Sequence, residues 1–175
     1  KGGKVTPTEA VHDKDALNRF FHHLVIEAGE RAELRHVVSL FLQFNGADDH
    51  ATVEKVFHAL LAGTQRHGGT INKIDFGDKG FTALVFFGAP VASENAEAAA
   101  VSFAQSLNTT GLKEIGGVTM SAGIDAGLVY SGLLGGERRN EWTCIGDAVN
   151  TSARLMSAAE PGQILVSQRV EKGAE

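Results

Sequence analysis

Two neighbouring stretches, TINKI at residues 70–74 and FTALVFF at residues 81–87, decide the fold of this chain. Both are rich in β-branched and aromatic residues, and the segment between them is rich in glycine and aspartate, so they predict a β-hairpin with a long connection. On each side of this hairpin, apolar residues recur at the spacing of an amphipathic helix. The helical positions are Val53, Val56, Phe57, Leu60 and Leu61 before the hairpin, and Ala100, Phe103, Ala104 and Leu107 after it. The hairpin is therefore expected between two helices.

Capping residues suggest where these helices begin and end. Asp48 or Asp49 is the predicted N-cap of the first helix, because a short polar side chain can bond the free amides of the first turn. That helix should end near Gly68 and Gly69. Ser93 is the predicted N-cap of the second helix.

Further strands are predicted outside the two helices. The run VVSLFLQF at residues 37–44 is β-rich and mostly apolar. Residues 118–124 alternate apolar with small polar residues, which is the pattern of a half-buried strand. The resulting order is β-α-β-β-α-β. This order predicts an α+β fold with a ferredoxin-like core.

The C-terminal part adds elements to this core. Residues 128–134 and 141–145 flank the polar turn GGERRN and predict a second hairpin. A helix at about residues 147–158 and a strand at residues 164–167 should follow.

The N-terminal part is expected to lie outside the core. Residues 1–13 contain glycine and proline without periodicity and are interpreted as a linker. Residues 14–30 predict an amphipathic helix that leads into a domain spanning residues 35–175. The chain begins without methionine and ends after an apolar run, so we expect a C-terminally truncated piece of a longer protein.

The composition excludes several classes of function. With 175 residues, 43% hydrophobic and 21% charged, the chain suits one globular domain. The 16 Lys and Arg against 21 Asp and Glu give a net charge of −5, which disfavours a nucleic-acid partner. No apolar run approaches the roughly 20 residues of a membrane span, so no membrane contact is expected. A single cysteine favours a reducing, cytoplasmic compartment.

Two consecutive stretches hold most residues suited to chemistry, namely GLVYSGLLG at residues 127–135 and RNEWTCIGDAVNTSARL at residues 139–155. They resemble the signature of the class III nucleotidyl cyclases, which convert ATP or GTP into a cyclic 3′,5′-monophosphate and pyrophosphate. Upstream, VVSLFLQF, GGTINK at residues 68–73 and VFFGAP at residues 85–90 are similar to strands of that family. Because the five fragments occur in the family's order over about residues 35–168, the chain is identified as a family member.

The resemblance implies a composite site between two head-to-tail cyclase domains. One half supplies metal-binding aspartates, and the other supplies base-reading and transition-state residues. Gln43 stands where the first metal aspartate is expected, and a neutral amide cannot balance two Mg²⁺ ions. Asp78 falls one place late for the second aspartate, so Asp75 and Asp78 are weak candidates. We therefore expect no metal site here, and Mg²⁺ or Mn²⁺ from the partner half.

Lys73 and Thr143 are the predicted base-reading residues. Lysine offers only donors and threonine offers an acceptor, which together match the N1 and N6 groups of adenine. The pair, and the extended hairpin around Lys73, resemble the second catalytic half of bicarbonate-regulated soluble adenylyl cyclases. Guanylyl cyclases carry an acidic residue and a cysteine at these places, whereas Cys144 is one position off and is expected on the opposite face.

Asn150 and Arg154 are the predicted catalytic residues. They are four residues apart, so on a helix both project from one face. One can orient the ribose and the other can neutralise charge on the phosphates. The resemblance implies these same roles, and it makes Arg139 a weaker candidate for contact with the triphosphate.

The favoured hypothesis is an adenylyl cyclase domain that acts on ATP together with a second cyclase domain, in the simplest case on the same longer chain. An alternative is a catalytically silent cyclase-homology module for dimerisation or ligand sensing. In that case Lys73 and Arg154 would be ordinary solvated side chains. A ferredoxin-like RNA-binding domain is a third possibility, which the net charge of −5 and the 7% aromatic content disfavour.

Overall fold

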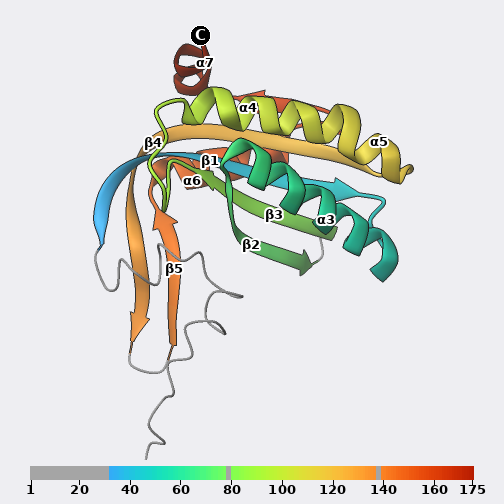
Figure 1. Cartoon of the computed structure of the whole chain (residues 1–175), viewed down its shortest axis with the longest axis horizontal. Coiled ribbons are helices and arrows are strands. Elements are labelled where there is room, and N and C mark those ends of the chain that lie inside the picture. The colour runs from blue at the N-terminus through green and yellow to red at the C-terminus, as the bar shows by residue number, and fades with distance from the viewer. Residues whose placement is uncertain (1–31, 78–79, 137–138) are drawn as a thin grey trace, which may run out of the picture.

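The computed structural model of the chain describes residues 32–77, 80–136 and 139–175 (Figure 1). The linker predicted at residues 1–13 and the helix predicted at residues 14–30 lie outside these described residues. None of the described helices is both long and apolar enough to cross a membrane.

The sheet carries its strands in the order β2-β3-β1-β4-β5, with antiparallel neighbours throughout, and β6 pairs with β4 in parallel. The elements are β1 (Glu33–Asn45), α3 (His50–His67), β2 (Thr70–Gly77), β3 (Gly80–Phe87), α4 (Ala96–Ser106), the π-helix η1 (Leu107–Gly111), α5 (Leu112–Ile115), β4 (Thr119–Gly136), β5 (Arg139–Ile145), α6 (Asp147–Ala158), β6 (Ile164–Val166) and α7 (Gln168–Ala174). The predicted α+β fold with a ferredoxin-like βαββαβ core is confirmed.

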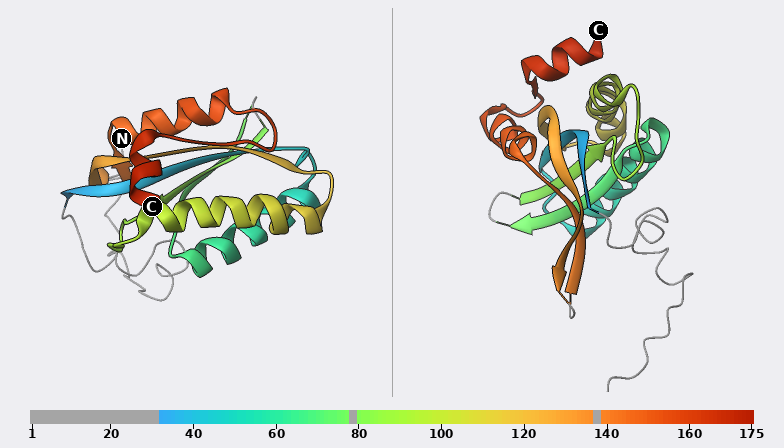
Figure 2. Two further views of the ribbon diagram at one scale, coloured as in Figure 1. Left: turned by 90° about the horizontal axis from the view of Figure 1, so that it is seen from above. Right: turned by 90° about the vertical axis from the view of Figure 1, so that its left-hand side faces the viewer.

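Helices cover both faces of the sheet, with α3 and α4 on one face and α6 on the other (Figure 2). Alternate residues of β1, namely Val38, Leu40, Leu42 and Phe44, belong to the main core under α3 and α4. On the other face, α6 lies so close to β4 that a Cβ at Gly123 would be 2.2 Å from the main chain of Ser152. Glycine is therefore required where α6 crosses β4.

The caps of the first helix agree with the sequence, whereas the second helix starts later. Asp49 is the N-cap of α3 and accepts a bond from the amide of Thr52, and Gly68 ends the helix in a left-handed conformation. The prediction that Ser93 caps α4 is wrong. Residues 94 and 95 form a turn, so α4 begins after Asn95.

Strand β4 is one continuous strand, although the sequence predicted two strands at residues 118–124 and 128–134. Between the two predicted runs lie Asp125 and Gly127, residue types that are unfavourable in strands. Their main chains nevertheless stay paired with β1, at Ser39 and Val37 respectively. The tertiary pairing thus outweighs the local preference.

The second half of β4 (residues 128–136) and the whole of β5 (residues 139–145) form a hairpin that extends beyond the helices (Figure 1). We call it the β4–β5 arm.

The helix α7 was not predicted, because it is short and buries only Val170. Ser167 caps it by accepting from the amide of Val170.

Candidate active site

Gln43 lies on the same face of the sheet as α6. It pairs directly with Thr82 of β3, which in turn pairs with Asp75 of β2. Directly opposed residues of antiparallel strands share a face, so these three side chains form one row across three strands. The place expected for the first metal aspartate thus holds a neutral amide in a row with one carboxylate.

Among the residues that the structure describes, this row does not make a two-metal site. Asp75 lies 4.0 Å from Lys73, measured from Oδ2 to Nζ, so its charge faces a cation of the same strand. Among residues 32–77, 80–136 and 139–175, no three His, Cys, Asp or Glu side chains are grouped to hold a metal. Asp78 lies outside the described residues. Two divalent ions need several carboxylate oxygens, and this row offers one carboxylate.

A β-bulge in β2 turns Lys73 toward the α6 face. Ile71 pairs with Val85 and packs against the main core, whereas Lys73 pairs with Leu84 on the other face. Residues two apart in a regular strand share a face, so the extra residue, Asn72, changes the face. The bulge depends on pairing with β3 and could not be predicted from the order of residues in β2.

Asn72 connects β2 to the β4–β5 arm. Its Nδ2 donates to the carbonyl oxygen of Trp142 at 2.8 Å, and its Oδ1 accepts from Oγ1 of Thr143 at 3.5 Å. The Trp142 ring also lies edge-on to Phe86 of β3, with 6.1 Å between the ring centroids. The strands β2 and β5 are at opposite ends of the sheet order, so the arm must bend back to make these contacts.

The contacts of Asn72 bring the two predicted base-reading residues into one region, since Lys73 directly follows Asn72 and Thr143 bonds to it. Sequence reasoning missed Asn72. The signal in the sequence that could have pointed to Asn72 is its position, since it is an amide side chain directly before Lys73.

Cys144 points away from Thr143, as expected for neighbours in a strand. It is buried in a second core with Val129 and Phe86, and burial raises the pKa of its thiol to about 11. The thiol therefore stays neutral near pH 7. Thr143 is half-buried on the opposite face of the arm.

The face of the arm that carries Thr143 is also strongly apolar. Thr143 pairs with Gly132, so it shares a face with every second residue of β4, and Ile145 pairs with Tyr130 on that face. The exposed fractions there are 70% for Leu128, 38% for Tyr130, 52% for Leu134 and 48% for Ile145. Such a surface is suited to burial against another protein face.

Asn150 and Arg154 lie on the exposed side of α6. The residues of α6 that face the sheet are Ala148, Ser152 and Met156, which are buried. Asn150 and Arg154 are offset from these by two positions and are both exposed, one helical turn apart. Arg139 begins β5, and its side chain lies outside the described part of the chain.

Comparison with known proteins identifies the family of this chain. The sequence model described as "Adenylate and Guanylate cyclase catalytic domain" matches residues 26–174. The chain is 30% identical over 181 residues to "Uncharacterized protein Rv1318c" of Mycobacterium tuberculosis (strain ATCC 25618 / H37Rv), which covers 93% of this chain and 33% of that protein. The chain thus spans about a third of the length of this curated relative.

Two solved structures have a similar fold. The guanylyl cyclase Cya2 is 26% identical, with a TM-score of 0.72 and coverage of 82% of this chain and 80% of that chain. The adenylyl cyclase CyaB from P. aeruginosa is 24% identical, with a TM-score of 0.71 and coverage of 82% of each chain. Since one is a guanylyl and the other an adenylyl cyclase, the fold alone does not determine the base.

Proposed function

Because this chain belongs to the family of adenylate and guanylate cyclase catalytic domains, we propose that it is the half of an adenylyl cyclase that binds adenine and the transition state. A partner half would supply the two metal ions. The observation that carries the proposal is the hydrogen bond from Thr143 to Asn72, the residue directly before Lys73. It is supported by Gln43, a neutral amide at the position where the resemblance expects the first metal aspartate.

The hydrogen bonds of Asn72 support a preference for adenine. The carbonyl of Trp142 can only accept, so the amide nitrogen of Asn72 must face it and the amide oxygen must face Thr143. The Thr143 hydroxyl then directs its hydrogen to Asn72 and leaves lone pairs for a donor. The N6 amine of adenine is such a donor, and Lys73 can donate to N1.

In the proposed reaction, the 3′ oxygen of ATP attacks the α-phosphorus, and the bond to pyrophosphate breaks. Arg154 would bond to the phosphates as charge grows on them, and Asn150 would orient the ribose. Divalent ions held by the partner half would polarise the phosphate oxygens. The exposed apolar face of the arm is the surface on which this chain would contact that half.

A catalytically silent cyclase-homology module is the second candidate. The row of Gln43, Thr82 and Asp75 contains one carboxylate, because Gln43 is a neutral amide. The test combines the chain with a cyclase domain that keeps both metal aspartates, and measures the cyclic AMP formed from ATP and the cyclic GMP formed from GTP. Formation of cyclic AMP that requires Arg154 supports the proposed function. If the combined domains bind each other but form no cyclic nucleotide, the silent module is the better description.

The base preference should depend on Lys73 and Thr143. In the combined domains, Lys73→Glu with Thr143→Cys should lower the ratio of ATP to GTP use by about 10-fold or more, because each lost base contact costs on the order of 1 to 3 kcal/mol. Steady-state kcat/KM with each nucleotide measures this ratio. The control is Lys113→Glu with Thr119→Cys at two exposed positions. An unchanged ratio would remove both residues from the pocket.

Asn72 should affect the same ratio without touching the base. In Asn72→Ala the Thr143 hydroxyl is free to rotate and to donate, so the ratio of ATP to GTP use should fall about threefold to tenfold. Asn108→Ala is a matched control, since Asn108 also donates its amide to a distant carbonyl, that of Gly162 at 3.1 Å. A ratio that stays the same in both variants would contradict a role for Asn72.

A further inference from the structure

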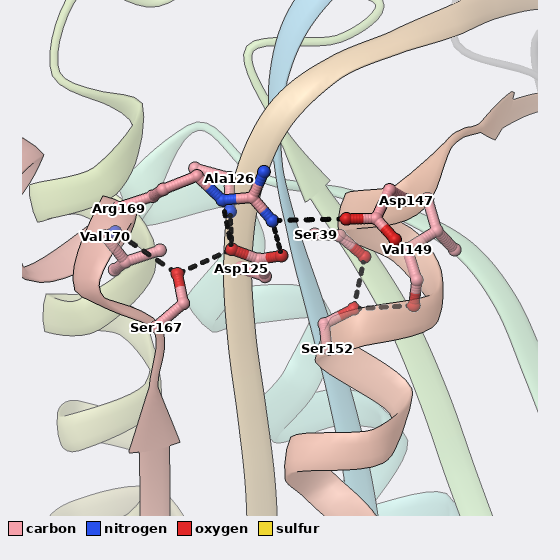
Figure 3. Close-up of polar contacts among 9 residues, drawn as sticks. All are labelled: Ser39, Asp125, Ala126, Asp147, Val149, Ser152, Ser167, Arg169 and Val170. Atoms are coloured by element: carbon pink, nitrogen blue, oxygen red, sulfur yellow. Dashed lines mark hydrogen bonds and ion pairs between the residues drawn. The ribbon is translucent and has the colours of Figure 1, made fainter.

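A buried carboxylate near α6 accepts hydrogen bonds at both of its oxygens. Asp125 of β4 has no exposed surface. Its Oδ1 accepts from the amide of Ala126 at 2.8 Å, from Oγ of Ser167 at 2.5 Å and from Nε of Arg169 at 3.1 Å. Its Oδ2 accepts from Nη2 of Arg169 at 2.5 Å (Figure 3). Both carboxylate oxygens of Asp125 thus accept hydrogen bonds, and the Arg169 guanidinium donates to them through two of its nitrogens.

The same guanidinium also reaches the start of α6. Nη2 of Arg169 lies 3.5 Å from Oδ2 of Asp147, which is the first residue of that helix (Figure 3). The Arg169 side chain is 52% exposed and that of Asp147 is 77% exposed. An exposed ion pair usually contributes little, partly because two long side chains must be ordered. Here the buried bond to Asp125 already orders the arginine, so less ordering is needed for its contact with Asp147.

The middle of α6 is held separately. Oγ of Ser152 lies 2.8 Å from Oγ of Ser39 on β1, and it also donates to the carbonyl of Val149. Both serines are buried. Ser152 therefore attaches the sheet-facing side of the helix to β1, and Asp147 links the first residue of the helix to Arg169. Asn150 lies between these two attachments, and Arg154 follows the second.

We propose that Arg169 is a positioning residue, which through Asp147 holds the first turn of α6 and thereby sets the direction of Asn150 and Arg154. This inference rests on the proposed function where it concerns the two site residues. It assigns a task to α7, which otherwise contributes one buried residue to the core. Arg169 acts through Asp147 and need not touch the nucleotide.

Two substitutions separate this role from general support of the fold. Asp147→Asn removes the outer charge and leaves the buried pair of Asp125 and Arg169 intact. Arg169→Lys keeps a cation beside Asp125, but an ammonium cannot grip both carboxylate oxygens and also reach Asp147. Lys172→Gln is the control, because it removes an exposed charge from the same helix.

The first measurement is amide hydrogen exchange of the whole chain, followed on peptides that cover residues 147–158. Both substitutions should speed exchange in these peptides by about threefold or more, while peptides from β1 and α3 keep their rates. Lys172→Gln should leave α6 unchanged. Exchange in α6 that stays at the wild-type rate in both variants would overturn the proposal.

The second measurement is steady-state kinetics of the chain combined with a metal-bearing half. Both substitutions should lower kcat by about tenfold and leave KM within twofold, because a small displacement of a catalytic group slows the chemical step. The melting temperature of Asp147→Asn should stay within a degree or two of wild type. A loss of activity that follows the loss of folded protein would also overturn the proposal. If the wild-type pair forms no cyclic nucleotide, the proposed function fails, and the exchange data still decide whether Arg169 holds α6.

Discussion

The chain alone should form almost no cyclic AMP, and an added metal-bearing cyclase half should raise the rate by about 10³-fold or more. The two metal ions contribute several kcal/mol of transition-state stabilisation, and each 1.36 kcal/mol corresponds to a factor of ten. A homodimer of this chain would have Gln43 at the metal position of both sites, with Asp75 as the one carboxylate of the row. Cyclic AMP is measured with Mg²⁺ and with Mn²⁺, over a range of chain concentrations that would reveal a weak homodimer.

Aspartate substitutions test where the metals bind. Turnover by the chain alone that survives Asp75→Ala with Asp78→Ala would mean that the metals bind elsewhere. Robust turnover that Asp78→Ala abolishes would make Asp78 a metal ligand and contradict the expected dependence on a partner half. Asp48→Ala, at an exposed position before α3, is the control for the loss of one negative charge.

The core of the fold was predictable because its signals are local. Each helix of the βαββαβ core shows its own apolar stripe, and the central hairpin shows two β-rich runs around a turn. The continuous β4 was not predictable, because the main chain at Asp125 stays in the sheet only through its pairing with Ser39. The buried carboxylate there is satisfied by Ser167 and Arg169, more than 40 residues later in the chain.

The candidate site also contains residues that could be predicted from the sequence and a residue that could not. Lys73 and Thr143 were selected by resemblance to a family, and their joint position could be expected. Asn72 could not, since its importance depends on a bulge and on a bend of the β4–β5 arm, which brings Trp142 to it. Interactions between elements far apart in the sequence leave no periodic signal in either one.

Arg154→Ala should lower kcat of the combined domains by about 10²-fold or more and change KM far less. Charge grows on the phosphates between the ground state and the transition state, so a cation that bonds to them acts mainly on the rate. Arg154 is exposed on α6 in this chain, so its removal leaves no cavity in the core. The melting temperature should therefore stay close to that of the wild type.

Asn150→Ala should give a similar loss of kcat, and the double variant should lose much less than the product of the two single losses. Both side chains lie one turn apart on α6 and would act on one geometry of ribose and phosphate, so removing either already disorders that geometry. Steady-state kinetics of the two single variants and the double variant measure this coupling, with thermal melting to exclude unfolding. Lys172→Ala, which removes an exposed cation from α7, is the control for a general effect of charge. If Arg154→Ala folds normally and keeps kcat within a few-fold of wild type, Arg154 is an ordinary solvated side chain, and the silent module becomes the better description of this domain.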